Sequence, residues 1–132
     1  LSASEPDSLP TFDIDVFGRA LVTNYAHHVQ ERLGAAFLDS RQRIVRQREI
    51  FVGTINHAAV STGDVVRCAL EENPYAVVLY HNHPSGDPSP PAEDLMFTRK
   101  MIESLRLCDI ELADHIVIGT HRFYSMRQRG QI

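Results

Sequence analysis

The chain has 132 residues, 43% of them hydrophobic and 23% charged, which is enough apolar material for one domain with a buried core. Its formal net charge of −4 argues against a general affinity for nucleic acid, because that binding depends on neutralising phosphates with Lys and Arg. We recognise no signal peptide and no apolar run long enough to span a bilayer, so we expect a cytoplasmic protein without a membrane partner.

The first half of the chain predicts one helix followed by two strands. Residues 1–11 are rich in serine and proline and lack periodicity, so we expect a flexible segment there and a domain over residues 12–132. From Asp13, hydrophobic residues recur at helical spacing. Residues 31–39 are apolar on both alternations, which predicts a central strand, and residues 43–52 mix apolar residues with arginines, which predicts a strand with one wet face.

The second half predicts two helices and three strands. A sequence that resembles a capping box, Ser61-Thr62-Gly63-Asp64, precedes a helical pattern over residues 65–72. Strands are predicted over residues 76–80 and 109–118 and, shorter, over 123–126, with a helix between the first two that ends near residue 107. In that helix we expect four side chains in the core: Leu95, Phe97, Ile102 and Leu105. Strands interleaved with three helices predict an α/β fold with a mixed sheet.

The strand over residues 76–80 leads into a stretch typical of a metal site. It ends in His81-Asn82-His83, and residues i and i+2 of a strand point to the same face. A loop rich in proline and glycine follows, then a helical pattern with Ser89 as a candidate N-cap and Pro90 at the first helical position. Asp94 would lie early in that helix, folded back toward the histidines. Two imidazoles and a carboxylate are typical of a catalytic zinc site with one open position.

The sequence H-N-H-P-S-G-D-P-S-P-x-x-E-D at residues 81–94, followed by L-A-D-H-I-V-I-G at residues 112–119, resembles the RadC-like branch of the JAMM (MPN-type, JAB) metalloprotein family. The resemblance runs from about residue 14 to the end. It implies a single JAMM/MPN-like domain, with a mixed, curved sheet flanked by about three helices in a cytidine-deaminase-like architecture. It also implies that Zn²⁺ is bound by His81, His83 and Asp94.

The activity implied by the resemblance is that of a zinc-dependent hydrolase of the metallopeptidase or isopeptidase type. Its substrate would be a peptide or an isopeptide-linked protein, and a glutamate would act as general base while water attacks the amide carbonyl. Two glutamates are candidates for this role. Glu31, in E-x-x-G, resembles the family's upstream glutamate and is favoured, whereas Glu49 lies among arginines that make a simple ion pair a sound alternative.

Other residues could support the ligands. Metal-bound histidines usually donate their second ring nitrogen to a carboxylate or carbonyl, so Asp114 and Asp87 are candidates to orient a ligand ring. His115 lies in an apolar strand and is expected to be buried and hydrogen-bonded, with a ligand role as the weaker alternative. His57 and His121 look like loop residues without a site role.

One position departs from the family pattern, because Pro91 stands where the pattern has serine. That serine is thought to support the water or the tetrahedral intermediate, and proline has no hydroxyl to do so. A zinc-binding but weakly active interaction module is therefore one alternative function. A second alternative is a DNA-repair-associated protein, from the label that RadC-like proteins carry, although the acidic charge disfavours nonspecific DNA binding.

Overall fold

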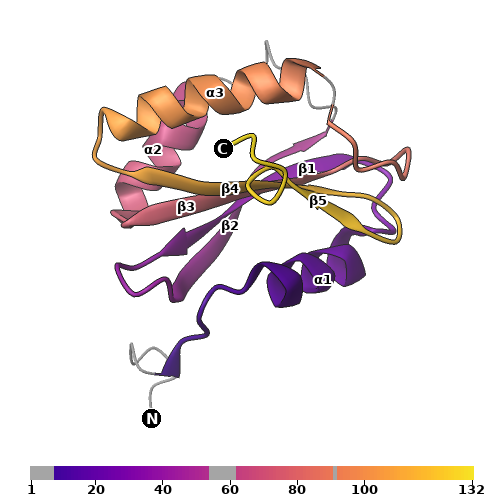
Figure 1. Cartoon of the computed structure of the whole chain (residues 1–132), viewed down its shortest axis with the longest axis horizontal. Coiled ribbons are helices and arrows are strands. Elements are labelled where there is room, and N and C mark those ends of the chain that lie inside the picture. The colour runs from indigo at the N-terminus through magenta and orange to yellow at the C-terminus, as the bar shows by residue number, and fades with distance from the viewer. Residues whose placement is uncertain (1–7, 54–61, 91) are drawn as a thin grey trace.

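The computed structural model describes residues 8–53, 62–90 and 92–132. Its centre is a five-stranded mixed sheet with the strand order β2-β1-β3-β4-β5 (Figure 1). The strands are β1 (Glu31–Leu38), β2 (Ile44–Gly53), β3 (Ala76–Asn82), β4 (Glu111–Ile118) and β5 (Phe123–Ser125). β3 and β4 run parallel, and the other neighbouring pairs run antiparallel. The predicted α/β fold with a mixed sheet is confirmed.

Three helices cover the two faces of this sheet, as predicted. Helix α1 (Ile14–Tyr25) lies on one face, and α2 (Thr62–Glu72) and α3 (Ala92–Arg106) lie on the other (Figure 1). Each face has its own hydrophobic core. Phe17 and Leu21 of α1 pack in one, and Met101 and Leu105 of α3 pack in the other. The α1 face and the α3 face are named below by these helices.

The burial of each strand follows from its place in the sheet. β1 lies between β2 and β3, and its residues from Leu33 to Leu38 are all buried, as the continuous apolar sequence predicts. β2 is an edge strand and is exposed or half-buried along its length, consistent with its arginines. β3 is buried throughout, including its final residue, Asn82. The end of β3 therefore delivers polar side chains into the protein interior.

Two predicted boundaries differ from the structure. Helix α3 begins at Ala92, not at Ser89 and Pro90, because Asp87 Oδ1 accepts a hydrogen bond from Ser89 N (2.9 Å) and keeps that residue in the loop. β4 begins at Glu111, because Asp109 has a left-handed backbone conformation (φ 60°) in the turn that ends α3. In both places a local turn shortens the regular element.

The interior face of α3 also differs from the prediction. Leu105 is buried as expected, but Leu95, Phe97 and Ile102 are only half-buried. The fully buried side chains on this helix are Asp94, Thr98, Met101 and Leu105. Two polar residues thus occupy the buried stripe at the start of the helix, where an apolar stripe would be expected.

The residues that precede α1 contact the start of β2. Of the segment predicted to be flexible, residues 8–11 are described. Pro10 O accepts a hydrogen bond from Ile44 N (2.8 Å), and Thr11 pairs with Arg43. Among the described residues, no helix combines the length and apolar character needed to cross a membrane.

Candidate metal centre

The two histidines of the H-x-H sequence meet at the end of β3. His81 is 3% exposed and pairs across the sheet with Leu33 of β1, which places its ring on the α3 face. His83 follows the strand, and its N–H donates to Ile118 O of β4 (2.8 Å), which extends the pairing. As expected for positions i and i+2, the rings share one face, and their Nε2 atoms are 3.0 Å apart.

Asp94 completes this group from the first turn of α3. Its side chain is buried, and Oδ2 lies 3.4 Å from His81 Nε2 and 3.3 Å from His83 Nε2. Two atoms bound to one zinc ion at about 2.0–2.1 Å with tetrahedral angles would be about 3.3 Å apart. The three donor atoms therefore have the mutual spacing of three ligands of one small cation. Within the described part of the chain, this is the one cluster of His, Cys, Asp or Glu that could hold a metal ion.

The second nitrogen of each ring has a partner. His83 Nδ1 is 2.9 Å from the backbone carbonyl of Asp87, which can only accept, so Nδ1 carries a proton and, in the neutral ring, Nε2 presents its lone pair. His81 Nδ1 is 2.9 Å from Nε2 of His115. His115 Nδ1 is in turn 2.6 Å from the hydroxyl of Thr98. Asp87 thus contacts a candidate ligand through its main chain.

The charges of the site are coupled. Burial alone would raise the pKa of Asp94, but the rings of His81 and His83, when they carry protons on the Nε2 atoms that face it, outweigh burial and hold that pKa well below its usual range. Burial alone would lower the pKa of His83, but its bonds with Asp94 and the Asp87 carbonyl, together with the charges of Asp94 and Glu31, raise it. The Asp94 carboxylate and the His83 ring therefore stabilise each other's charged forms.

Of the two candidate bases, Glu31 lies on the side of the sheet that carries the histidines. It begins β1, is half-buried, and its charge acts on His83. Asn82 holds the backbone on both sides of it: Asn82 Oδ1 accepts from Arg32 N (2.7 Å) and Asn82 Nδ2 donates to Gln30 O (3.1 Å). The candidate base is thereby fixed relative to the strand that bears the histidines.

Glu49 lies on the α1 face instead. It pairs with Gly34, which pairs in turn with Tyr80, a member of the α1-face core. Its carboxylate accepts hydrogen bonds from Arg32 Nη1 (3.0 Å) and Tyr25 Oη (3.4 Å). This is the ion pair that the arginine-rich sequence suggested, and the sheet separates it from His81.

Asp114 does not take its predicted role of orienting a ligand ring, because its side chain points to the α1 face, whereas that of its neighbour His115 points to the α3 face. It pairs with Val78 of the α1-face core, whereas His115 pairs with Leu79 of the α3-face core. Its carboxylate accepts from Ser125 Oγ (2.5 Å), His115 N (2.7 Å) and Arg127 N (3.0 Å). Burial raises its pKa, although these bonds oppose the shift. Its hydrogen bonds thus hold the C-terminal turn in place, not a candidate ligand ring.

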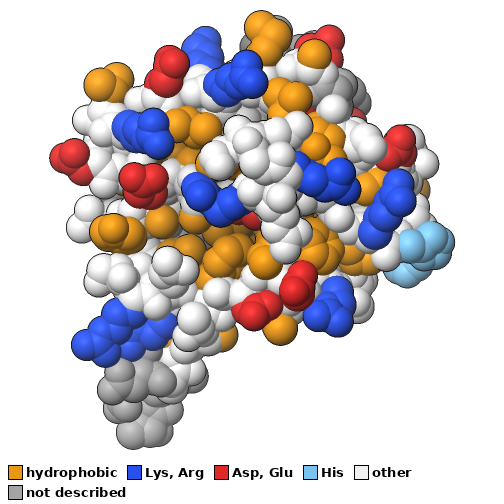
Figure 2. Space-filling model, viewed as in Figure 1, with side chains coloured by type: hydrophobic (Ala, Val, Ile, Leu, Met, Phe, Trp, Pro, Cys, Tyr) orange, Lys and Arg blue, Asp and Glu red, His pale blue; other side chains and the backbone are white. Residues whose placement is uncertain are grey.

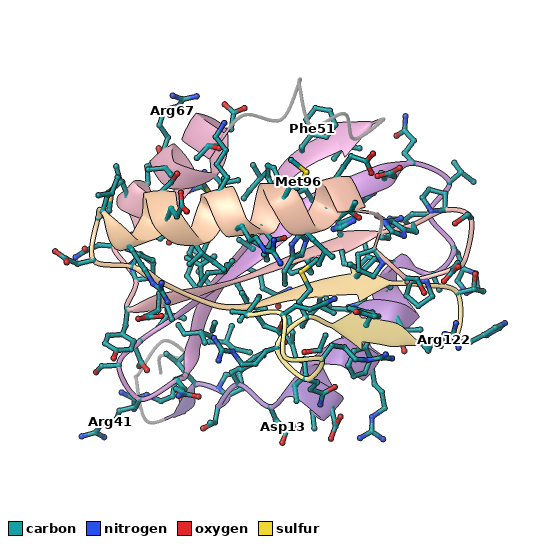
Figure 3. The ribbon with its side chains drawn as sticks, turned by 45° about the horizontal axis from the view of Figure 1, so that its top comes forward. Asp13, Arg41, Phe51, Arg67, Met96 and Arg122 are labelled. Carbon is teal, nitrogen blue, oxygen red and sulfur yellow. The ribbon has the colours of Figure 1, made fainter. Side chains whose placement is uncertain are left out.

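The loop that carries His83 packs against the connection between β4 and β5. Gly86 O accepts from Thr120 N (3.1 Å), and a Cβ atom at Gly119 would lie 2.5 Å from the same oxygen, so only glycine fits there. The Arg122 side chain extends outward from this connection (Figure 3), with its guanidinium 4.0 Å from the Asp87 carboxylate. Two loops that are distant in sequence therefore border the candidate site.

Three residues that support the candidate site were not identified from the sequence as acting on it. They are Thr98, His115 in its contact with His81, and Asn82, which holds the backbone beside Glu31. Thr98 could have been noticed, because it lies four positions after Asp94 on the same helix face. His121 is exposed in the β4–β5 connection. His57 and Pro91 lie outside the described residues, so the expectations about them are not tested.

Comparisons with known proteins agree with the geometry. Residues 14–131 match the family described as RadC-like JAB domain. A UPF0758 protein of Roseiflexus castenholzii is 46% identical over 105 residues, covering 80% of this chain and 45% of that protein. UPF0758 proteins of Marinobacter nauticus (44% over 112 residues; 85% and 50% covered) and Chloroflexus aurantiacus (39% over 110 residues; 83% and 48% covered) are similar in the same way. The chain spans about half the length of these relatives.

Proposed function

Because this chain belongs to the RadC-like JAB domain family, we propose that it is a zinc-dependent hydrolase that cleaves an amide bond in a peptide or an isopeptide-linked protein. The observation that carries the proposal is the convergence of His81, His83 and Asp94, whose donor atoms lie 3.0–3.4 Å from one another. Glu31, at the start of the adjacent strand on the same face, supports the hydrolytic part of the proposal.

The donor set suits a small divalent cation. With Nδ1 of His83 bonded to a carbonyl, its Nε2 lone pair faces Asp94 Oδ2 and His81 Nε2, and such electron-rich atoms repel one another unless a cation or a proton lies between them. Two imidazole nitrogens and one carboxylate oxygen are ligands that zinc accepts. Bound there, zinc would lower the pKa of its water to about 7 and polarise the carbonyl under attack.

The chain's own residues supply the proton transfer. We assign Glu31 as the base that takes a proton from the attacking water and gives it to the leaving amine nitrogen as the C–N bond breaks. The amide of Asn82 makes two hydrogen bonds to the backbone on either side of Glu31, which fixes the main chain from which the carboxylate extends. Glu49 cannot take this role without crossing the sheet.

The test separates metal binding from turnover. We expect the purified protein to hold about one equivalent of zinc and to cleave peptide or isopeptide substrates in a zinc-dependent way. Glu31→Gln should keep the zinc and lose roughly 10²–10⁴-fold in rate, the usual contribution of a general base. Glu49→Gln is the matched control and should keep both. Folded protein that takes up no zinc, or a fully active Glu31→Gln variant, would contradict the proposal.

A second candidate is a zinc-binding interaction module with little turnover. The observation that favours it is Pro91 in place of the family's serine. Removal of one hydrogen-bond donor to a developing oxyanion typically costs a hundredfold or more. On this reading Pro91→Ser should raise turnover by about that factor, and Pro90→Ser, the control at the neighbouring position, should not. A wild-type rate that Pro91→Ser does not improve would reject it.

A DNA-associated role has less support. The chain is acidic overall, and on the face seen in Figure 2 Lys and Arg side chains are interspersed with Asp and Glu. DNA binding that weakens steeply with salt would favour this role, whereas no measurable binding at low salt would reject it.

The free thiols Cys68 and Cys108 support the proposed cytoplasmic location, because such thiols persist in a reducing compartment.

A further inference from the structure

Three buried side chains connect β3, β4 and α3 behind the candidate ligands. They are His81, His115 and Thr98, which are 3%, 1% and 2% exposed. His81 Nδ1 lies 2.9 Å from His115 Nε2, and His115 Nδ1 lies 2.6 Å from Thr98 Oγ1. Thr98 Oγ1 also lies 2.7 Å from the backbone carbonyl of Asp94. Bulk water does not reach any of the three, so protein groups decide where their protons lie.

The direction of each bond follows from the chemistry of Thr98. A hydroxyl has one hydrogen, and a carbonyl oxygen can only accept. The hydrogen of Thr98 therefore points to Asp94 O, and its oxygen accepts a bond from His115 Nδ1. A neutral imidazole with its proton on Nδ1 has a lone pair on Nε2. His115 Nε2 thus accepts, and His81 Nδ1 must be the donor across the 2.9 Å contact.

We propose that Thr98 and His115 are positioning residues that fix the tautomer of His81, and so set how strongly the site binds its metal ion. With its proton held on Nδ1, His81 presents the Nε2 lone pair toward Asp94 and His83. The opposite tautomer would place a hydrogen at the atom that must bind the metal. The inference rests on the proposed function for its consequence, although the order of the protons is a property of the metal-free protein.

The arrangement also links two of the ligands. The Thr98 hydroxyl, which accepts the bond from His115, donates its own hydrogen to the backbone carbonyl of Asp94 in the first turn of α3. Asp94 Oδ2 returns to His81 Nε2 at 3.4 Å, which closes a ring of contacts through three elements of the fold. Loss of the hydroxyl would free His115 to carry its proton on Nε2, donate to His81 Nδ1, and leave the proton of His81 on Nε2.

Metal affinity provides the first test. Loss of a residue that hydrogen-bonds to a metal ligand typically weakens binding by about 10–100-fold. We expect that loss for zinc in Thr98→Val, which keeps the shape and removes the hydroxyl, and near wild-type affinity in Thr98→Ser. Thr23→Val is the matched control, because the Thr23 hydroxyl makes the same bond to a carbonyl four residues earlier on α1 (3.1 Å). Equal affinity of wild type and Thr98→Val would overturn the proposal.

The tautomers themselves provide the second test and need no metal. Histidine ¹⁵N NMR spectra of the metal-free protein at about pH 8, where an ordinary imidazole is neutral, should show the protons of His81 and His115 on Nδ1. In Thr98→Val the proton of His81 should move to Nε2, and in Thr98→Ser it should stay. A wild-type spectrum with His81 protonated on Nε2 would overturn the proposal even if no variant folds. Failure to bind zinc would instead reject the proposed function and leave this result standing.

Discussion

Two buried carboxylates on opposite faces of the sheet have opposite electrostatic character. Asp94 and Asp114 are 4% and 2% exposed, yet the pKa of the first is lowered and that of the second is raised. Around Asp114 each oxygen meets its own donor, either a hydroxyl or a backbone N–H. The carboxylate of Asp94 instead converges with the rings of His81 and His83 on one point. Burial alone therefore does not identify a functional carboxylate, whereas the convergence of several possible metal-binding atoms on one point does.

The largest expected difference between the two regions is in metal affinity. Asp94→Asn replaces an anionic ligand with a neutral one and should weaken zinc binding by more than about 100-fold, the upper end for loss of a residue that only supports a ligand. Asp114→Asn should leave the affinity unchanged. Competition with a chelator of known affinity measures both. Equal losses in the two variants would mean that the Asp114 region contributes to the site after all.

The next effect is on stability, and here substitution of Asp114 should cost more than substitution of Asp94. Asp114→Ala removes the acceptor of three buried donors and should lower the free energy of unfolding by about 2 kcal/mol or more. Asp94→Ala, compared in metal-free protein at about pH 8, should cost less, because an ordinary imidazole is neutral at that pH and offsets the charge of the carboxylate less than a protonated ring does. Urea unfolding in the presence of a chelator tests both. A strongly destabilised, metal-free Asp94→Ala would show that Asp94 also has a structural role.

The pH dependence of metal binding gives a smaller effect. Since the pKa of His83 is raised, the ring holds its proton at a higher pH than an ordinary histidine, whose pKa is about 6.5. A metal ion must displace that proton, so zinc affinity should fall by about tenfold per pH unit below the raised pKa and level off above it. Calorimetric titration from about pH 5.5 to 8 measures the profile. Affinity that stays constant across this range would contradict it.

The smallest effect concerns the ionisation of Asp114. Its pKa is raised above the ordinary 3.8, so the folded state binds the proton more tightly than the unfolded state. Its contribution to stability is complete below the unfolded pKa and is lost as the pH rises through the folded value. Asp114→Asn has no such loss, so its stability relative to wild type should improve across that window. Parallel stability curves from about pH 3 to 7 would show that the pKa is not raised.

The convergence of His81, His83 and Asp94 could be predicted because these residues are close along the chain. The spacing of His81, His83 and Asp94 within one strand–loop–helix unit fixes their approach almost without reference to the rest of the fold. The start of α3 was harder to predict from the sequence. Ser89 and Pro90 have the composition of a helix start, but the carboxylate of Asp87 captures Ser89 N and delays the helix.

Contacts that depend on strand register could not be predicted from the sequence. A shift in pairing between Val77 and Val78 places His115 opposite Leu79, on the face of His81, and turns Asp114 away from it. A second shift, between Leu33 and Gly34, places Glu49 opposite Gly34 and so on the α1 face. A change of one residue in register moves a side chain to the other face of a sheet. Local patterns do not encode that choice, so the supporting residues required the structure.

The parallel direction of β3 and β4 has a consequence for how this family can diversify. Parallel neighbours end at the same border of the sheet, so residues 119–122 lie beside the segment that carries His83, and Gly86 and Thr120 are joined by a hydrogen bond. Substitutions at the exposed positions Thr120, His121 and Arg122 would change the surface beside this segment without altering His81, His83 or Asp94, so under the proposed function they would change which substrates are admitted. Selectivity and chemistry would then be free to evolve separately.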